Sequence, residues 1–365
     1  MQIYFLNHAM MVYTKAMKRE KTRQTKIGTI LIGGQNKVLI QSMCKHKTSD
    51  IDLVVEEINE CAKLGADLMR VAVLDEADAL AIKTIVSKIS IPLVADIHFD
   101  ARLALLAIEN GVQKVRLNPG NIKDENMIKE VVLSAKKHGV VIRVGANSGS
   151  LNSDVDALPI SLAEKLVLSA KKQIDILEKY DFRDIVVSIK ASNIKETIAA
   201  YRLASEIFPY PLHIGITEAG PKDISLVRSV AGLSPLLLEG IGDTIRISIT
   251  GDARDEVLAA KRLLHDCELY ANYPTLISCP TCGRTQVDVR PLGEKIFTYL
   301  EENSIPLSVA VMGCVVNGPG EAKSADIGIA GGKGQYIIFK KGKLIKKMSE
   351  DEAYDTMINE IKSML

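Results

Sequence analysis

Short β-branched runs alternate with amphipathic stretches along most of the chain. Each run is followed by a turn and then by a segment in which apolar residues recur every three or four positions, the spacing of one helix face. The runs predict eight strands, at residues 38–42, 68–73, 91–96, 114–118, 140–144, 185–190, 212–216 and 244–249. The stretches after them predict helices at 50–64, 76–87, 101–110, 126–138, 161–180, 194–208, 225–233 and 254–265.

Eight alternating strand and helix units predict a (β/α)8 TIM barrel, for which about 250 residues is typical. An open doubly wound sheet is the alternative, but no Gly-x-Gly-x-x-Gly fingerprint of a dinucleotide site is present. We therefore predict an α/β protein with three parts: an N-terminal arm at 1–26, solvated or loosely docked, a TIM barrel substrate-binding domain at 27–270, and a small α+β domain at 271–365. The small domain is expected to hold strands at 305–312, 325–330 and 336–339 and helices at 293–303 and 350–364.

Composition supports an α/β enzyme and excludes several other classes. Apolar residues make up 47% of the 365-residue chain, aromatic residues only 4%, and tryptophan is absent. A formal net charge of +1 gives no reason to expect a nucleic acid or an acidic membrane surface as partner. No signal peptide or membrane span is predicted, and the spacing of the six cysteines argues against a disulfide framework, so reduced thiols and a cytoplasmic location are expected.

Polar side chains stand at the ends of the predicted strands, where TIM barrels place their active sites. Most of these strand ends carry a charged group. The polar and charged residues at these strand ends are Arg70, Asp96 with His98, Arg116, Arg143 with Asn147, Lys190, Thr217 with Glu218, and Arg246 with Ser248. A shared anion at the barrel mouth explains so many charges inside β-branched runs, because the guanidinium fork matches phosphate oxygens.

Charge counting makes the expected anion more specific. Four arginines and Lys190, set against Asp96 and Glu218, leave three uncompensated positive charges, which favours a small polyanion such as a diphosphate. Structural ion pairs across the barrel are the alternative for any single arginine. His98 and His213 are either ligand contacts or histidines satisfied within the core.

Three cysteines near the C-terminus have the spacing of a metal site. Cys279 and Cys282 form a Cys-x-x-Cys turn, and Cys314 follows in a glycine-rich segment. A closed zinc site takes four protein ligands and a four-iron cluster takes four thiolates, so three thiolates indicate an open metal or an oxygen ligand in the fourth place. Glu321, at the end of a Gly-Pro-Gly turn, is the candidate. The spacing leaves an iron–sulfur cluster, a zinc ion and plain thiols open.

These motifs together resemble the IspG family, the 4-hydroxy-3-methylbut-2-enyl diphosphate synthases, in its compact two-domain bacterial form. The resemblance spans residues 22–340 and lies in segments 41–43, 69–73, 95–99, 115–121, 143–150, 188–192, 217–220 and 240–246 and in both cysteine segments. Two features depart from the family pattern: the arm is long, and Cys44 stands where threonine is more usual.

The resemblance implies a function and a set of site residues. It implies a reductase-like second domain in which Cys279, Cys282, Cys314 and Glu321 hold a [4Fe-4S] cluster. It implies reductive ring opening and dehydration of 2-C-methyl-D-erythritol 2,4-cyclodiphosphate in the methylerythritol phosphate route to isoprenoids, with flavodoxin or ferredoxin as electron donor and a head-to-tail homodimer. The implied substrate-binding residues are Arg70, Arg116, Arg143, Asn147, Lys190, Thr217, Arg246 and Ser248, and the implied catalytic residues are Asp96, His98, Glu218 and Glu321.

Two other classes of protein remain to be weighed. A phosphate-binding barrel enzyme of the aldolase or pterin-synthase kind, with a structural zinc knuckle, would need no electrons. An iron–sulfur sensor or scaffold would need no functional groups at the strand ends, which argues against it. Metal analysis and substitution of Glu321 separate these classes.

Overall fold

A computed structural model of the chain describes residues 19–97, 100–118, 122, 124–151, 153–314, 322–332 and 334–365. The chain divides into two compact units, and the division falls between Tyr270 and Ala271. His98, Glu321 and the first 18 residues of the predicted arm lie outside the described residues.

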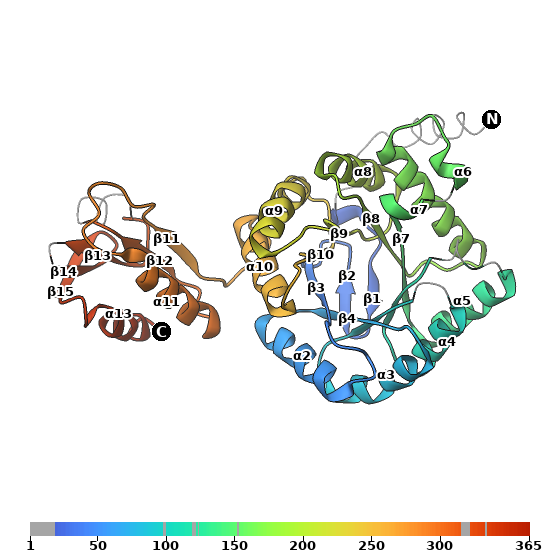
Figure 1. The fold of residues 1–365 in the computed structure, drawn as a ribbon, viewed down its shortest axis with the longest axis horizontal. Coiled ribbons are helices and arrows are strands. Elements are labelled where there is room, and N and C mark those ends of the chain that lie inside the picture. Colours follow the sequence, from blue (N-terminus) through green and yellow to red (C-terminus); the bar gives the residue numbers. More distant parts are fainter. Residues whose placement is uncertain are drawn as a thin grey trace. The chain divides into compact units, whose positions relative to one another are not determined.

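The first unit is the predicted TIM barrel (Figure 1). Its eight strands are parallel and follow the order β8-β7-β6-β5-β4-β3-β10-β9. A parallel bridge between Val187 and Leu212 joins the two ends of this order and closes the barrel. The strands are β3 (Leu39–Met43), β4 (Leu68–Ala72), β5 (Leu93–Asp96), β6 (Lys114–Arg116), β7 (Val141–Asn147), β8 (Ile185–Lys190), β9 (His213–Gly215) and β10 (Thr244–Arg246).

Helices surround the strands and bury their apolar faces against them (Figure 1). They are α2 (Ile51–Leu64), α3 (Glu76–Lys88), α4 (Ala101–Glu109), α5 (Glu125–His138), α7 (Leu162–Lys179), α8 (Ile194–Ile207), α9 (Lys222–Leu238) and α10 (Ala253–Asp266). Short helical turns add η1 (Arg19–Lys21), η3 (Ser148–Ser150) and α6 (Ser153–Asp156). Helix α9 is longer than predicted, because Pro235 lies inside it without ending it.

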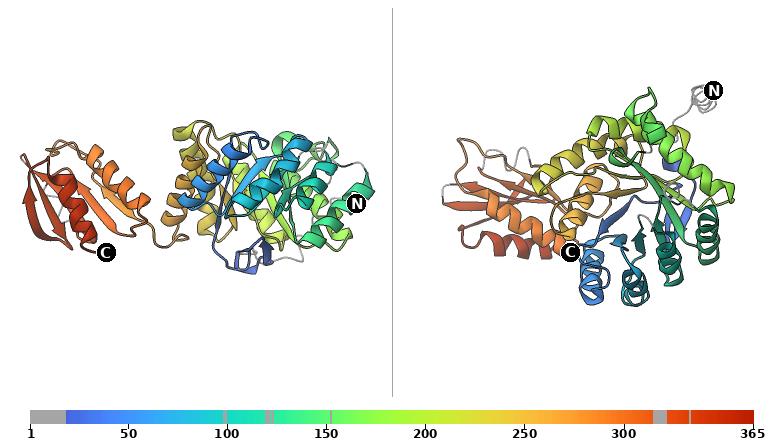
Figure 2. Two further views of the ribbon diagram at one scale, coloured as in Figure 1. Left: turned by 90° about the horizontal axis from the view of Figure 1, so that it is seen from below. Right: turned by 45° about the vertical axis from the view of Figure 1, so that its right-hand side comes forward.

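A hairpin of β1 (Thr25–Ile27) and β2 (Ile30–Ile32) covers the N-terminal end of the barrel (Figure 2). Ile27 and Ile32 are fully buried in a cluster with the first residues of the barrel strands, such as Leu39 and Leu68. The hairpin therefore seals this end, and the opposite end is the one that remains for a ligand.

The predicted boundary of the arm at residue 26 falls inside β1. Residues 19–26 are held by the barrel, because the Arg19 and Arg23 amides donate to the carbonyls of Gly240 and Pro209. Thr22 also donates to the Asp243 carboxylate at 3.1 Å. These polar contacts are long-range in sequence, which is why the local pattern reads as a solvated segment.

The second unit is a five-stranded mixed sheet in the order β11-β12-β13-β14-β15. Its strands are β11 (Thr275–Ser278), β12 (Ser308–Met312), β13 (Ile327–Gly332), β14 (Gln335–Lys340) and β15 (Lys343–Met348), and its helices are α11 (Val289–Glu302) and α13 (Ala353–Lys362). Both helices pack on one face of the sheet, where Ile296 and Met357 meet Val309 and Ile329. The two edge strands were not predicted: most of β15 is exposed and three of its six residues are lysines, a composition that protects a sheet edge.

Candidate active site

A pocket of about 200 Å³ opens at the C-terminal end of the barrel strands. It gathers side chains from six strands and the segments that follow them, as expected for a TIM barrel site. Its lining residues are Arg70, Asp96, Arg116, Arg143, Gly145, Asn147, Ser188, Lys190, Thr217, Arg246 and Ser248. All eight residues predicted to bind substrate are present, together with Asp96, whereas Gly145 and Ser188 were not predicted.

Strand register aligns polar and charged residues of the site on neighbouring strands. Asp96 pairs with Arg116, and Arg116 in turn pairs with Arg143, across the neighbouring strands β5, β6 and β7. Asn147 and Lys190 are paired in the same way between β7 and β8. Neighbours in a parallel sheet point to the same side, so the pairing directs these groups into one space.

Asp96 and Glu256 compensate part of the positive charge. The Asp96 carboxylate lies 3.4 Å from Arg116 and 3.7 Å from Arg70. Glu256, on α10, lies 3.4 Å from both Nε and Nη2 of Arg246. The second acid beside the pocket is therefore Glu256 rather than the predicted Glu218. Five cations stand against Asp96 and Glu256, which leaves an excess of three positive charges.

Arg143 and Lys190 are two buried cations of the pocket with few partners among the described residues. The Arg143 side chain is only 3% exposed, and its Nε and Nη1 atoms have no hydrogen-bond partner among the described residues. Lys190 is 8% exposed and forms no ion pair with any other residue that the structure describes. Unpartnered buried donors are costly, and an anion with several acceptor oxygens would satisfy them.

The crowding of cations shows in their pKa values. Burial, together with the charges of Arg246 and Arg116, lowers the pKa of Arg70 to about 10, while Asp96 opposes the shift. Burial, followed by the charges of Arg143 and Arg246, lowers the pKa of Lys190 well below its ordinary value. The site therefore favours any ligand that brings negative charge.

Two glycines leave the space that these long side chains occupy. A Cβ atom on Gly215 would lie 2.8 Å from the Arg246 carbonyl oxygen and 3.1 Å from the Lys190 ammonium. A Cβ on Gly145 would lie 2.6 Å from the Ser188 carbonyl oxygen. Glycine at both positions is explained by close approach of neighbouring strands and side chains.

The remaining predicted residues of the barrel are placed differently. Glu218 is exposed, does not line the pocket, and has a backbone φ of 53° in the loop after β9. His213 is fully buried below the pocket, where its Nδ1 lies 2.7 Å from the Thr244 hydroxyl. His213 is therefore a core histidine of which only one nitrogen is satisfied, because its buried Nε2 has no hydrogen-bond partner among the described residues. His98 lies outside the described residues.

Cys279 and Cys314 follow two neighbouring parallel strands. Ser278, the last residue of β11, pairs with Val311 of β12, and the Cys279 amide continues this ladder by donating to the Val311 carbonyl at 3.0 Å. Cys314 comes two residues after the end of β12. The two cysteines are thus brought to the same edge of the sheet.

The turn that carries Cys282 is attached to the same edge. Two hydrogen bonds hold this turn. The Cys282 amide donates to Thr285 Oγ1 at 2.9 Å, and the Gln286 amide donates to the Gly313 carbonyl at 3.0 Å. Hydrogen bonds from the backbone and side chain of Arg284 lower the pKa of the exposed Cys282 thiol. The segments of all three cysteines therefore meet at one edge of the sheet.

Among the described residues, no group of three or more His, Cys, Asp or Glu side chains lies close enough together to hold a metal ion. Glu321 lies outside the described residues. The donor set nevertheless fits an iron–sulfur centre, because three soft thiol ligands come from one edge and Cys314 is buried.

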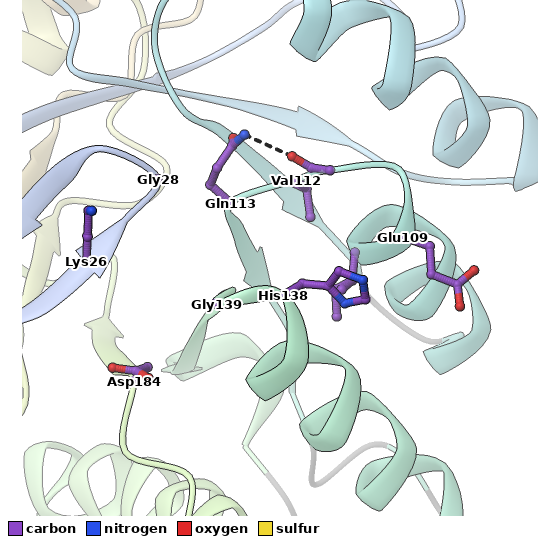
Figure 3. A pocket seen from close by; sticks show the side chains of 10 residues that line it. Lys26, Gly28, Glu109, Val112, Gln113, His138, Gly139 and Asp184 are labelled. Atoms are coloured by element: carbon purple, nitrogen blue, oxygen red, sulfur yellow. Dashed lines mark hydrogen bonds between the residues drawn. The ribbon is translucent and has the colours of Figure 1, made fainter.

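A second hollow, of about 500 Å³, lies at the opposite end of the barrel, beside the β1–β2 hairpin (Figure 3). Its polar groups are largely satisfied within the protein: Asp184 accepts from Thr25 at 2.6 Å, and Gln113 bonds the Leu93 amide and the Gly111 carbonyl. It is larger than the pocket at the strand C-termini but lacks the excess of charge that would select a ligand.

Separately, no helix in the described part of the chain is long and apolar enough to cross a bilayer.

Comparison with known proteins agrees with this architecture. The GcpE TIM-barrel domain matches residues 22–261, and the GcpE protein C-terminal domain matches residues 275–363. The chain is 48% identical to the 4-hydroxy-3-methylbut-2-en-1-yl diphosphate synthase (flavodoxin) of Clostridium perfringens, over 95% of this chain and 100% of that protein. It is 49% identical to the enzyme of the same name from Caldanaerobacter subterraneus, over 95% and 98% of the two chains.

Solved structures support the barrel alone. A dihydropteroate synthase from Stenotrophomonas maltophilia superposes with a TM-score of 0.52 and 12% identity, covering 68% of this chain and 97% of that one. At this identity the likeness shows a shared barrel fold and carries no argument about function. The two family domains and the near full-length relatives show that the chain belongs to the GcpE family of 4-hydroxy-3-methylbut-2-en-1-yl diphosphate synthases.

Proposed function

We propose that the protein catalyses the reductive ring opening and dehydration of 2-C-methyl-D-erythritol 2,4-cyclodiphosphate to 4-hydroxy-3-methylbut-2-enyl diphosphate, in the methylerythritol phosphate pathway. The reaction takes up two electrons and two protons and releases one water. The observation that carries the proposal is the cationic pocket at the barrel mouth, found in a member of this family.

The pocket suits the two phosphates of the cyclic substrate. Arg143 and Lys190 are buried, and among the described residues they have no acidic partner to compete with a ligand. Arg70 and Arg116 share the single carboxylate of Asp96, so this pair keeps a net positive charge that suits a phosphate group. Arg246, Asn147, Thr217 and Ser248 complete the ring of donors.

Acid–base work falls to a smaller group of residues. Asp96 lines the pocket beside Arg116, and we propose that it contacts the hydroxyl groups of the substrate or moves a proton. Glu218 and His98 are proposed for the same work, Glu218 from the exposed loop after β9. Glu321 is proposed both as a cluster ligand and as a proton donor.

We further propose a [4Fe-4S] cluster held by Cys279, Cys282, Cys314 and Glu321. Such a cluster supplies the electrons and an iron that polarises a substrate oxygen for C–O cleavage. The protein contributes the edge of the small sheet, which brings the segments of the three cysteines together, and a carboxylate that is a harder and more labile ligand than a thiolate.

The electron donor, assembly and location are parts of the same proposal. The relatives are named as flavodoxin enzymes, so flavodoxin is the proposed donor and ferredoxin the alternative. A head-to-tail homodimer and a cytoplasmic location are proposed with it. Sedimentation of the anaerobic protein tests the dimer.

Metal analysis and turnover test the proposal together. Protein purified without oxygen is expected to contain about four irons and four sulfides per chain, with absorption that bleaches on reduction. With reduced flavodoxin it should convert the cyclic diphosphate to the linear allylic diphosphate. Stoichiometric zinc without sulfide, persisting after anaerobic reconstitution with iron and sulfide, would exclude the reductive reaction and favour a barrel enzyme with a zinc knuckle.

A further inference from the structure

Glu256 is a buried acid whose role the pocket itself does not explain. It lies in the first turn of α10, where acids are usually exposed, yet only 1% of it is accessible. It does not line the pocket at the barrel mouth. Its carboxylate instead accepts hydrogen bonds from four other groups.

The four groups belong to different parts of the barrel. Oε2 accepts from Ser42 of β3 at 2.5 Å, and Oε1 accepts from the Lys45 ammonium at 2.8 Å. Oε1 also accepts from the Ile249 amide at 3.0 Å, in the loop that follows β10. Both oxygens lie 3.4 Å from the guanidinium of Arg246, a residue that does line the pocket.

This network holds the part of the site that comes from β10 and the loop after it. Arg246 ends β10, and Ser248 lies between Arg246 and the anchored Ile249 amide. Ser225 holds the same loop from outside, by donating to the Ser248 carbonyl at 2.8 Å. The loop and the guanidinium therefore share one anchor, the Glu256 carboxylate.

The charge of Glu256 agrees with this role. Burial alone would raise its pKa, but Arg246, Lys45 and Ser42 together lower it. The contacts to Arg246 are longer than those to Ser42 and Lys45, so they orient the guanidinium without using its full bonding capacity. Donors of Arg246 remain for a ligand.

We propose that Glu256 is a positioning residue for anion recognition: it holds Arg246 and the Ser248 loop in the orientation that binds a phosphate group of the substrate. The inference rests on the proposed function for the identity of the substrate. The recognition step is tested without turnover, because inorganic diphosphate serves as the probe.

The decisive variant is Glu256→Gln in the anaerobically purified full-length protein. Glutamine keeps the size and one acceptor oxygen, but its NH2 group cannot accept from the Arg246 guanidinium. Calorimetry is expected to show that the Kd for inorganic diphosphate rises about tenfold, the effect of losing one charge-assisted hydrogen bond. In turnover, KM for the cyclic diphosphate should rise by a similar factor while kcat changes less than about threefold.

Asp255→Asn is the matched control. Asp255 is the neighbouring acid of the same helical turn, and it pairs with the exposed Lys222 at 2.8 Å. The Asp255→Asn variant loses the same formal charge from the same helix end as Glu256→Gln. Because the ion pair of Asp255 is with an exposed lysine, the Kd of this control should remain within about twofold of the parent. A similar loss of affinity in both variants would mean that general electrostatics, and not positioning, is responsible.

A double-mutant cycle separates positioning from a purely structural role. Arg246→Ala should weaken diphosphate binding, and adding Glu256→Gln should then weaken it no further, because both changes act through one guanidinium. Independent, multiplying effects would overturn the proposal. So would a lowered Tm for Glu256→Gln with an unchanged Kd.

Ser42→Ala keeps the test available if Glu256→Gln does not fold. It removes only the 2.5 Å bond that orients Oε2, the oxygen that faces Arg246 Nε. The Kd is expected to rise about threefold, and an unchanged Kd would count against positioning. Failure of the parent to turn over the cyclic substrate would instead reject the proposed function and leave these binding results standing.

Discussion

Asp96 and Arg116 face each other across the paired strands β5 and β6, with Oδ1 of the acid 3.4 Å from Nη1 of the arginine. The same carboxylate lies 3.7 Å from Nε of Arg70. Asp96 is thus the charge that compensates these two neighbouring arginines, and a bound diphosphate would add to this compensation.

Replacing Asp96 with Asn should separate binding from turnover. The variant keeps the shape of the side chain but leaves Arg70 and Arg116 without their shared charge, so the free protein is destabilised. We expect inorganic diphosphate to raise the Tm of the variant more than that of the parent, while turnover falls at least tenfold. Differential scanning calorimetry with and without diphosphate measures the first effect. Equal Tm shifts in the two proteins would show that Asp96 does not compensate the arginines.

Arg143→Met should improve stability and harm binding. The guanidinium of Arg143 is buried with Nε and Nη1 unpartnered in the described structure, so an apolar side chain of similar length removes a cost of folding. We expect the free energy of unfolding to rise by about 1–3 kcal/mol and the binding of diphosphate to weaken by roughly 1.5–3 kcal/mol.

Denaturant titration in phosphate-free buffer and calorimetry measure the two effects of Arg143→Met. Arg202→Met is the control, because Arg202 forms an exposed ion pair with Glu239 and neither residue lines the pocket. Its loss should cost no more than about 1 kcal/mol and leave binding unchanged. An Arg143 variant with lower stability and unchanged affinity would identify Arg143 as a structural residue.

Gly215→Ala tests whether space around Lys190 matters. The added Cβ would approach the Arg246 carbonyl to 2.8 Å and the Lys190 ammonium to 3.1 Å, so β9 and the lysine must both shift. We expect diphosphate affinity to fall several-fold and Tm to fall with it. Gly251→Ala is the control, since its nearest neighbour would be the Ile249 side chain at an ordinary 3.6 Å. Equal behaviour of the two variants would exclude a steric role for Gly215.

The barrel could be predicted because its strands are apolar on both faces. Val186 and Val187, for example, are consecutive and both fully buried, one among the residues of the sealed end and the other in the main core. Such a continuous apolar, β-branched run predicts a buried strand from the local sequence alone. The lysine-rich edge strand β15 has no buried face of its own over most of its length, and therefore no period to detect.

Predicting the site succeeded for residues on strands and failed for contacts between distant segments. Arg143 and Lys190 stand out because a charge inside a β-branched run is unusual. Glu256 gives no such signal: it follows Asp252 and Asp255 in what reads as an exposed, acidic helix start. Only the closed barrel, which brings β10 beside β3, reveals that it is buried against Ser42.

Ligand binding should be coupled to proton uptake through Lys190. Burial and the charges of Arg143 and Arg246 lower the pKa of this lysine well below its ordinary value of 10.5. Between the lowered value and 10.5 the unfolded chain holds the proton and the folded chain does not, so Lys190 makes stability rise with pH in this window. A bound diphosphate favours the charged lysine, so binding in the same window should take up a proton and weaken as the pH rises.

Calorimetry at mildly alkaline pH, in two buffers with different ionisation enthalpies, measures that uptake. The difference between the observed binding enthalpies in the two buffers gives the number of protons taken up on binding. We expect Lys190 to contribute up to one proton per site, and Lys190→Met should remove this contribution. Arg143 and His213 also have lowered pKa values from burial and nearby cations, so a smaller residual uptake is expected in the variant. Lys114→Met is the matched control, because this buried lysine bonds Gln41 at 2.8 Å and does not line the pocket. Equal proton uptake by Lys190→Met and the parent would mean that Lys190 is already charged in the free protein. Other groups of the protein, and not the diphosphate, would then stabilise its buried ammonium.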